Sequence, residues 1–234
     1  MWGSATFDPD REIPDLSGKT ILITGGSSGL GLESVRQLAR HGANVILAAR
    51  NKSKSLAVIE QLKTEHSHAH ISFLQLDLAS FASVAAAAKT VLTENDRMDV
   101  LMNNGGIMAV PEGLTVEGYE IHFGTNHMGH ALLTKLLMPL LLKTSDLPGA
   151  DVRIVNLTSI AQEQLAPTAG FLPSEAKTTM PNRGTWERYG HSKLANVLFT
   201  KALSQRYPQL TCVAVHPGGV KTDLADTVSA IRTG

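Results

Sequence analysis

The strongest restriction on the fold comes from a glycine-rich junction near the N-terminus. The segment TGGSSGLG follows the apolar residues 21–23 and precedes a helical pattern over residues 29–41. Glycines in a strand-to-helix turn let the backbone approach an anion without Cβ clashes, and the helix N-terminus attracts negative charge. The junction therefore predicts a pyrophosphate-binding turn, in which Gly31 also lets the helix approach the sheet closely. Its expected contact residues are Gly25, Ser27, Ser28, Gly29, Leu30 and Gly31.

Short apolar runs alternate with helical patterns along the rest of the chain. Six runs have the character of strands: residues 19–25, 44–50, 71–77, 99–103, 152–159 and 211–217. Between them, residues 52–65 and 80–93 have helical patterns. Near-continuous apolar strands alternating with helices predict a doubly wound parallel sheet, a Rossmann-like three-layer α/β/α fold. We expect one domain over residues 1–234, with an N-terminal extension at 1–17 and an inserted, irregular substrate-side loop at 161–188.

Charge and hydropathy exclude several classes of partner. The chain has 21 basic and 21 acidic residues and no block of like charges, so nucleic acid and acidic membrane surfaces are disfavoured. No segment approaches the ~18 apolar residues of a membrane span, and the N-terminus lacks the apolar core of a signal peptide. We expect a soluble, cytoplasmic protein. The single cysteine, Cys212, lies in an apolar strand pattern and is expected to be a buried structural thiol.

Five motifs in a fixed order resemble the signature of the short-chain dehydrogenase/reductase family. They are TGGSSGLG, NNGG at 103–106, Ser159 after IVNLTS, YGHSK at 189–193 and HPGG at 216–219. The resemblance extends from about residue 19 to residue 223, and NHMGH with the loop after Ser159 resembles the retinol-dehydrogenase-like and WW-domain-oxidoreductase-like branch. It implies an NAD(P)-binding oxidoreductase for a small carbonyl or alcohol substrate, assembled as a homodimer or homotetramer.

Tyr189 and Lys193 are four residues apart, so on a helix their head groups can converge on one ligand. A free phenol has a pKa of about 10, so a nearby ammonium is needed to stabilise the phenolate. Tyr189 is then the expected proton donor or acceptor, and Ser159 is expected to hydrogen-bond the substrate oxygen. The resemblance adds Asn126, which would order a water beside Lys193, and assigns Lys193 to the nicotinamide ribose.

The end of the second strand predicts the type of cofactor. Arg50 and Asn51 stand where NAD-dependent folds carry a carboxylate, which favours NADP over NAD, although a solvated strand end would also place an arginine there. The resemblance places Asp77 and Leu78 beside the adenine and Asn104, Gly105 and Gly106 beneath it. Gly105 departs from the family's usual alanine, which predicts a slightly looser turn. The resemblance also places Pro217, Gly218, Val220 and Thr222 around the nicotinamide.

Other assignments remain open. His122, His127 and His130 have the spacing of metal ligands, but no suitable cysteine or carboxylate completes a site, so no metal is expected. The chain ends at Gly234, before the elements that close the family's substrate pocket, which favours a dinucleotide-binding regulatory or scaffold protein as the alternative function. An epimerase or dehydratase would need a larger substrate domain. Phe171, Leu172 and Trp186 indicate an apolar ligand, with steroid, retinoid, fatty aldehyde and polyketide carbonyl all open.

Overall fold

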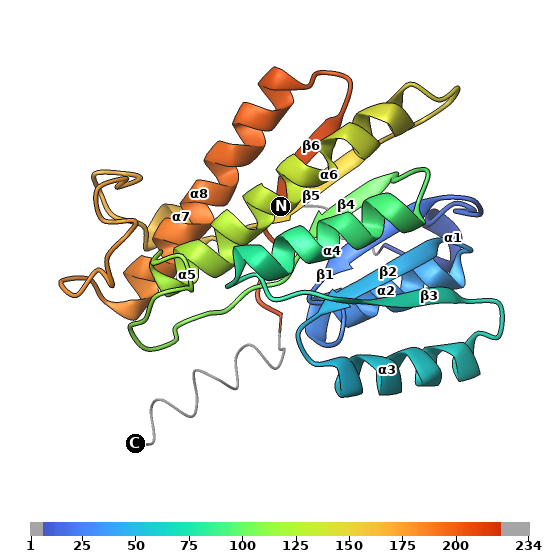
Figure 1. The fold of residues 1–234 in the computed structure, drawn as a ribbon, viewed down its shortest axis with the longest axis horizontal. Coiled ribbons are helices and arrows are strands. Elements are labelled where there is room, and N and C mark those ends of the chain that lie inside the picture. The colour runs from blue at the N-terminus through green and yellow to red at the C-terminus, as the bar shows by residue number, and fades with distance from the viewer. Residues whose placement is uncertain (1–6, 221–234) are drawn as a thin grey trace.

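A six-stranded parallel sheet forms the centre of the protein (Figure 1). The computed structural model describes residues 7–220. The strand order is β3-β2-β1-β4-β5-β6, so the direction of strand addition reverses beside β1. In such a sheet ligands bind beyond the carboxyl ends of the strands at this switch point. The strands are β1 (Thr20–Thr24), β2 (Asn44–Ala49), β3 (His70–Gln75), β4 (Val100–Asn103), β5 (Arg153–Leu157) and β6 (Thr211–Val215).

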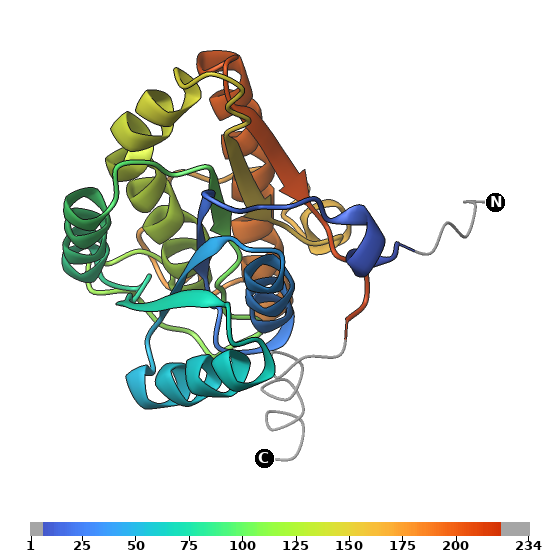
Figure 2. The same ribbon diagram turned by 90° about the vertical axis from the view of Figure 1, so that its right-hand side faces the viewer.

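Helices cover both faces of the sheet (Figure 2). One face carries α2 and α3, and the other carries α4, α6 and α8. The helical elements are α1 (Pro9–Glu12), α2 (Gly29–Arg40), α3 (Lys52–Glu65), α4 (Phe81–Glu94), α5 (Ile121–Phe123), the π-helical turn η1 (Gly124–Met128), α6 (Gly129–Ser145), α7 (Ala161–Gln164) and α8 (Thr185–Arg206). This three-layer arrangement confirms the predicted doubly wound fold.

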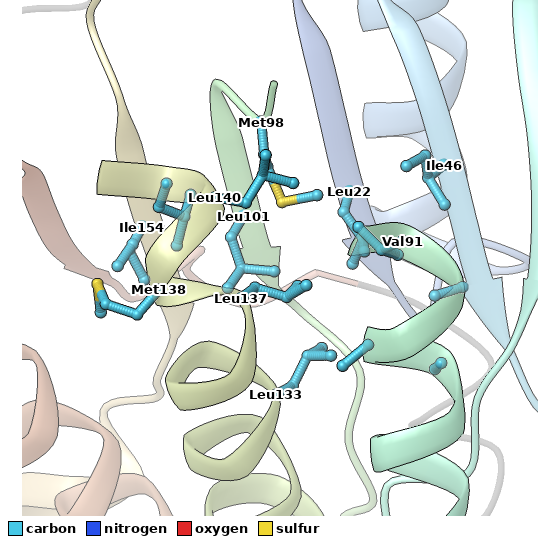
Figure 3. Packing of buried hydrophobic residues seen from close by; sticks show 14 of the residues in the cluster. Leu22, Ile46, Val91, Met98, Leu101, Leu133, Leu137, Met138, Leu140 and Ile154 are labelled. Atoms are coloured by element: carbon cyan, nitrogen blue, oxygen red, sulfur yellow. The ribbon is translucent and has the colours of Figure 1, made fainter. Parts of the chain in front are cut away.

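The alternation of side chains along β1 shows why the strands are apolar throughout. Leu22 packs with Leu101 and Leu137 in the core under α4 and α6 (Figure 3), whereas Ile21 and Ile23 pack in the core under α2 and α3. All three β1 side chains are at most 2% exposed. Burial of each such side chain contributes roughly 1.5–3 kcal/mol, so both faces of the sheet need apolar residues.

The predicted boundaries differ from the observed ones by one or two residues in most elements. The helix expected at 52–65 is observed as α3 with those bounds, and Ser80 caps α4 by accepting from the Ser83 N–H. The span 161–188 is less irregular than expected, because it begins with α7 and ends in the first turn of α8.

The expectation that Cys212 is fully buried is wrong. Cys212 lies on β6, which pairs only with β5 in the described part of the chain, and its side chain is partly exposed. The periodicity of a strand reports its apolar faces but does not report whether the strand lies at the edge of a sheet.

Candidate active site

Two adjoining hollows lie beyond the carboxyl ends of the strands, at the switch point of the sheet. Their volumes are about 300 Å³ and about 260 Å³, and both are lined by the glycine turn, Arg50 and the 105–107 segment. The larger also contains Tyr189 and Lys193, whereas the smaller extends towards the end of β3. Together they are lined by these predicted residues: Gly25, Ser27, Ser28, Gly29, Leu30, Gly31, Arg50, Asn51, Asp77, Leu78, Asn104, Gly105, Gly106, Tyr189, Lys193 and Pro217.

The glycine turn approaches neighbouring backbone too closely for side chains. A Cβ on Gly25, whose φ is +68°, would lie 2.8 Å from the Cα of Gly105, and a Cβ on Gly31 would lie 2.3 Å from the Gly25 carbonyl oxygen. Ser28 caps α2 without a side-chain hydrogen bond, and the first turn of α2 carries no acidic residue. The backbone N–H groups of this turn are therefore left for an anion.

Thr24 joins the glycine turn to the NNGG segment. Its Oγ1 accepts hydrogen bonds from the backbone N–H groups of Asn104 at 3.0 Å and Gly105 at 2.8 Å. The Asn104 amide returns a bond to the Thr24 carbonyl at 2.8 Å, and His130 Nε2 lies 2.8 Å from Thr24 Oγ1. These bonds fix two segments of the cavity floor relative to each other.

Gly105 is closely packed by its neighbours. A Cβ at this position would lie 3.0 Å from Leu78 Cδ1 and 3.3 Å from the Gly25 nitrogen. An alanine at this position would therefore require Leu78 to shift slightly.

Arg50 and Asn51 follow β2 at the rim of both hollows. Arg50 is exposed, and its guanidinium has no ion-pair partner among residues 7–220. Asn51 has a structural task as well, because its Oδ1 accepts from the Lys54 N–H at 3.0 Å and caps α3. The positive charge of Arg50 thus faces the cavity beside polar donors.

Tyr189 and Lys193 are both buried, on the second and third turns of α8. Lys193 Nζ lies 5.7 Å from the centroid of the Tyr189 ring and donates a hydrogen bond to the Leu157 carbonyl at 3.0 Å. Burial lowers the pKa of Lys193 to about 8. Burial also raises the pKa of Tyr189, and its hydrogen bond with Ser159 partly opposes that change. Desolvation outweighs the influence of Ser159, so the change is opposite in direction to the lowering that an ammonium neighbour would cause.

Asn126 is fully buried in the π-helical turn η1, and both ends of its amide are engaged. Its Oδ1 accepts from the Ile107 N–H at 2.8 Å, and its Nδ2 donates to the Ile107 carbonyl and to Ser192 Oγ, each at 3.0 Å. π-Helical turns often occur at functional sites because they redirect a side chain. Here the turn holds Asn126 against the cavity-lining segment and against Ser192, the residue before Lys193.

Several predicted residues lie outside the two hollows. Ser159 lines neither hollow, although it bonds Tyr189. Gly218 and Val220 are exposed and also line neither of them. Thr222 lies outside the described residues.

The three histidines considered as metal ligands are engaged separately. His122 contacts Glu120, His127 contacts Asn196, and His130 lies between Thr24 and the Asn126 carbonyl. Burial lowers the pKa of His127 to about 4 and that of His130 to about 3. No three His, Cys, Asp or Glu side chains within residues 7–220 are grouped so that they could hold a metal ion.

Sequence reasoning did not assign Thr24, Met108 or Val110 to the site, and it considered His130 only as a metal ligand. Thr24 and His130 are 106 positions apart, and only the spacing of Asn126 and His130 by four residues could have indicated that both belong to one helical face. Met108 and Val110 line the larger hollow from a segment with no regular pattern. No periodic signal marks residues of that kind.

Comparison with known proteins places this geometry in context. The model of the short chain dehydrogenase family matches residues 19–171. An uncharacterized oxidoreductase of Schizosaccharomyces pombe is 42% identical over 92% of this chain and 64% of its own length. Human retinol dehydrogenase 13 is 39% identical over 89% of this chain and 61% of its own length. The chain thus spans less than two thirds of these relatives.

Solved structures show the same architecture. An uncharacterized protein from Mycobacterium paratuberculosis superposes with a TM-score of 0.77 at 35% identity, over 94% of this chain and 75% of that chain. A short chain dehydrogenase from Shigella flexneri, complexed with NADP, superposes with a TM-score of 0.72 at 26% identity, over 95% and 85% of the two chains. No helix among residues 7–220 combines the length and apolar character needed to cross a membrane.

Proposed function

Since this chain belongs to the short-chain dehydrogenase/reductase family and its relatives include retinol dehydrogenases, we propose that it is an NADP(H)-dependent oxidoreductase interconverting a carbonyl and an alcohol on a small, apolar substrate. One observation carries the proposal. Tyr189 and Lys193 lie in the same hollow of about 300 Å³ as the glycine turn, although about 160 residues separate them along the chain. A phenol, a titratable amine and an anion-binding turn in one cavity are the components that hydride transfer with proton exchange requires.

The residues present fit a dinucleotide. A Cβ on Gly25 or Gly31 would collide with neighbouring backbone, so only glycines allow a turn this tight. Because α2 also begins without a capping side chain, the turn suits a pyrophosphate. Asp77 and Leu78 line the smaller hollow, where an adenosine group would lie. When bound, the nicotinamide would supply or accept a hydride.

The protein's own residues would manage the proton. The raised pKa of Tyr189 keeps its phenol protonated at neutral pH, so that it can donate a proton to a carbonyl oxygen as negative charge develops there. Ser159 lies near enough to Tyr189 to oppose the rise of its pKa and would share that oxygen as a second donor. The pKa of Lys193, about 8, allows it to hold or release a proton near neutrality. Asn126 would position Ile107 at the cavity wall.

Arg50 supports NADP as the cofactor. Arg50 lines both hollows, as does Ser28, and Ser27 lines the smaller one. A guanidinium is the type of group that binds the 2′-phosphate of NADP. The structure of the Shigella flexneri short chain dehydrogenase contains NADP, in agreement with this choice. An NADP-dependent enzyme would act mainly as a reductase.

The proposal includes a homodimer or homotetramer in the cytoplasm.

A titration of the purified chain with NADPH and NADH, followed by nicotinamide fluorescence, tests the proposal first. We expect saturable binding and a clear preference for NADPH. The second step follows absorbance of NADPH during incubation with a panel of aldehydes and ketones. Binding without turnover of any carbonyl would favour a regulatory or scaffold protein, and no binding of either dinucleotide would contradict the proposal.

A further inference from the structure

A buried cluster of charged side chains lies directly beside Tyr189, and the proposed chemistry does not use it. Glu120 and His122 are 0% exposed and Arg188 is 3% exposed. Buried ionisable groups are costly unless their partners are well placed, and removing one member leaves the others without compensation. The hydrogen bonds that these buried side chains make to the backbone therefore indicate which segment the cluster holds in place.

The Glu120 carboxylate fixes the orientation of His122. Its Oε1 lies 2.8 Å from His122 Nδ1, while its Oε2 accepts from the Phe123 N–H at 2.7 Å. His122 Nε2 accepts from the Val110 N–H at 3.2 Å. Because Nε2 is the acceptor, the imidazole proton is on Nδ1 and is donated to Glu120.

Two side chains of α8 bind the carbonyl group of Val110. Thr185 Oγ1 donates to the Val110 carbonyl at 2.7 Å, and Arg188 Nη2 donates to it at 3.4 Å. Arg188 Nε lies 3.5 Å from Glu120 Oε1, so the positive and negative charges compensate each other within the cluster. Val110 is therefore held at both its N–H and its carbonyl by side chains from α5 and α8.

Val110 forms part of the cavity wall. Met108 and Val110 line the larger hollow together with Tyr189. Between them, Ala109 has a φ of +52° and is 2% exposed, a left-handed conformation that a non-glycine residue adopts only when its surroundings enforce it. Such strained residues concentrate at functional sites. The bonds to Val110 are what hold this strained turn against the cavity.

We propose that Glu120, His122, Arg188 and Thr185 form a positioning clamp on Val110, which sets the wall of the substrate site formed by Met108 and Val110. The clamp acts on the substrate through Val110 and does not touch the glycine turn. It also borders the phenol, since the His122 ring packs edge-on against the Tyr189 ring with centroids 6.2 Å apart. The role in substrate binding rests on the proposed function, whereas the hold on Val110 does not.

Two variants of His122 test the clamp in the full chain. His122→Leu removes both hydrogen bonds, and His122→Gln keeps one acceptor and one donor. We expect His122→Leu to raise the hydrogen-exchange rate of the Val110 amide by about 10-fold, as loss of one buried hydrogen bond predicts, and His122→Gln to restore most of the protection. Amides of β1 should exchange as before. In the parent protein, nitrogen chemical shifts of His122 should report a proton on Nδ1.

Kinetics with NADPH and nonanal, a straight-chain aldehyde, test the role in substrate binding. We expect His122→Leu to raise KM about 10-fold, to change kcat less than about 3-fold, and to leave the Kd for NADPH within about 2-fold, because only the wall of the site moves. His41→Leu is the matched control, since His41 bonds a backbone carbonyl at the far end of α2. It should change none of these quantities.

The outcomes separate the two proposals. An unchanged exchange rate at Val110 in His122→Leu would overturn the clamp, and so would a rate that rises equally across β1. If His122→Leu does not fold, Thr185→Val decides, because it removes one donor to Val110 while keeping the side-chain shape. If the parent chain does not reduce nonanal, the proposed function is in question, but the exchange rates and the His122 tautomer still decide the clamp.

Discussion

Lys193 Nζ lies over the face of the Tyr189 ring, 5.7 Å from its centroid, and donates its hydrogen bond to the Leu157 carbonyl. The ammonium thus attracts the ring electrons and does not bond the phenolic oxygen. Burial raises the pKa of Tyr189. In this state the pair presents a protonated phenol, which is the form needed to donate a proton to a carbonyl oxygen.

Tyr189→Phe should remove turnover and spare cofactor binding. The substitution deletes the hydroxyl and keeps the ring, so carbonyl reduction should fall by about 10²–10⁴-fold, the usual contribution of a general acid. NADPH affinity should stay within about 2-fold, because the glycine turn is untouched. Steady-state assays and fluorescence titration measure both quantities. Tyr207→Phe, at the end of α8, is the control, and equal turnover in Tyr189→Phe and the parent would remove Tyr189 from its assigned role.

The lowered pKa of Lys193 predicts a specific dependence of stability on pH. Its pKa of about 8 in the folded protein lies below the ordinary value of 10.5, so between these values the unfolded chain binds more protons than the folded chain. Stability must then rise with pH across that window. From pH 7.5 to 9.5 this one group should add about 2 kcal/mol to the free energy of unfolding.

Urea denaturation of the parent and of Lys193→Met at these two pH values measures this effect. The parent should gain about 2 kcal/mol relative to the variant, which lacks the titrating amine. The same pH dependence in both proteins would show that the amine is not titrating near pH 8. Comparing the two proteins removes the contributions of all other groups that titrate in this range.

The sheet and the glycine turn could be predicted because their signals are local. Leu22 lies between Ile21 and Ile23 in sequence, and the alternation of their burial follows directly from strand geometry. The TGGSSGLG segment can likewise be interpreted without distant residues, because Gly25 and Gly31 are needed for the close approach of backbone segments. Features of this kind need only a few neighbouring residues.

The electrostatics of the site could not be predicted, because they depend on contacts between distant segments. Burial raises the pKa of Tyr189, and the spacing of Tyr189 and Lys193 in the sequence does not report that burial. Val110 is held by His122 and Arg188, which lie 12 and 78 residues further along. His122 was considered only as a metal ligand, since its spacing from other histidines does not indicate its contact with Glu120.

Arg50→Asp should reduce the preference for NADPH over NADH. Arg50 lines both hollows without a carboxylate partner in the described residues, so its charge is available to a phosphate. Replacing it with a carboxylate adds repulsion, and the Kd for NADPH should rise about 10–100-fold while that for NADH changes little. Parallel fluorescence titrations measure the ratio. Arg153→Asp, at the opposite end of the sheet, should leave the ratio of the two Kd values unchanged. An unchanged ratio in Arg50→Asp would mean that Arg50 does not bind the 2′-phosphate.

Gly31→Ala should damage the dinucleotide site through packing alone. The added Cβ would lie 2.3 Å from the Gly25 carbonyl oxygen and 2.6 Å from Asn104 Nδ2, so backbone must move to admit it. Overpacking of this kind costs about 1–3 kcal/mol, and the shift of α2 should weaken NADPH binding by about tenfold or more. Thermal unfolding and NADPH titration measure the two effects. Gly113→Ala is the matched control, because its Cβ would meet Ile121 at an ordinary 3.7 Å. Full NADPH affinity in Gly31→Ala would mean that the turn can open without loss of the site, and the close approach of α2 to β1 would then have no part in binding.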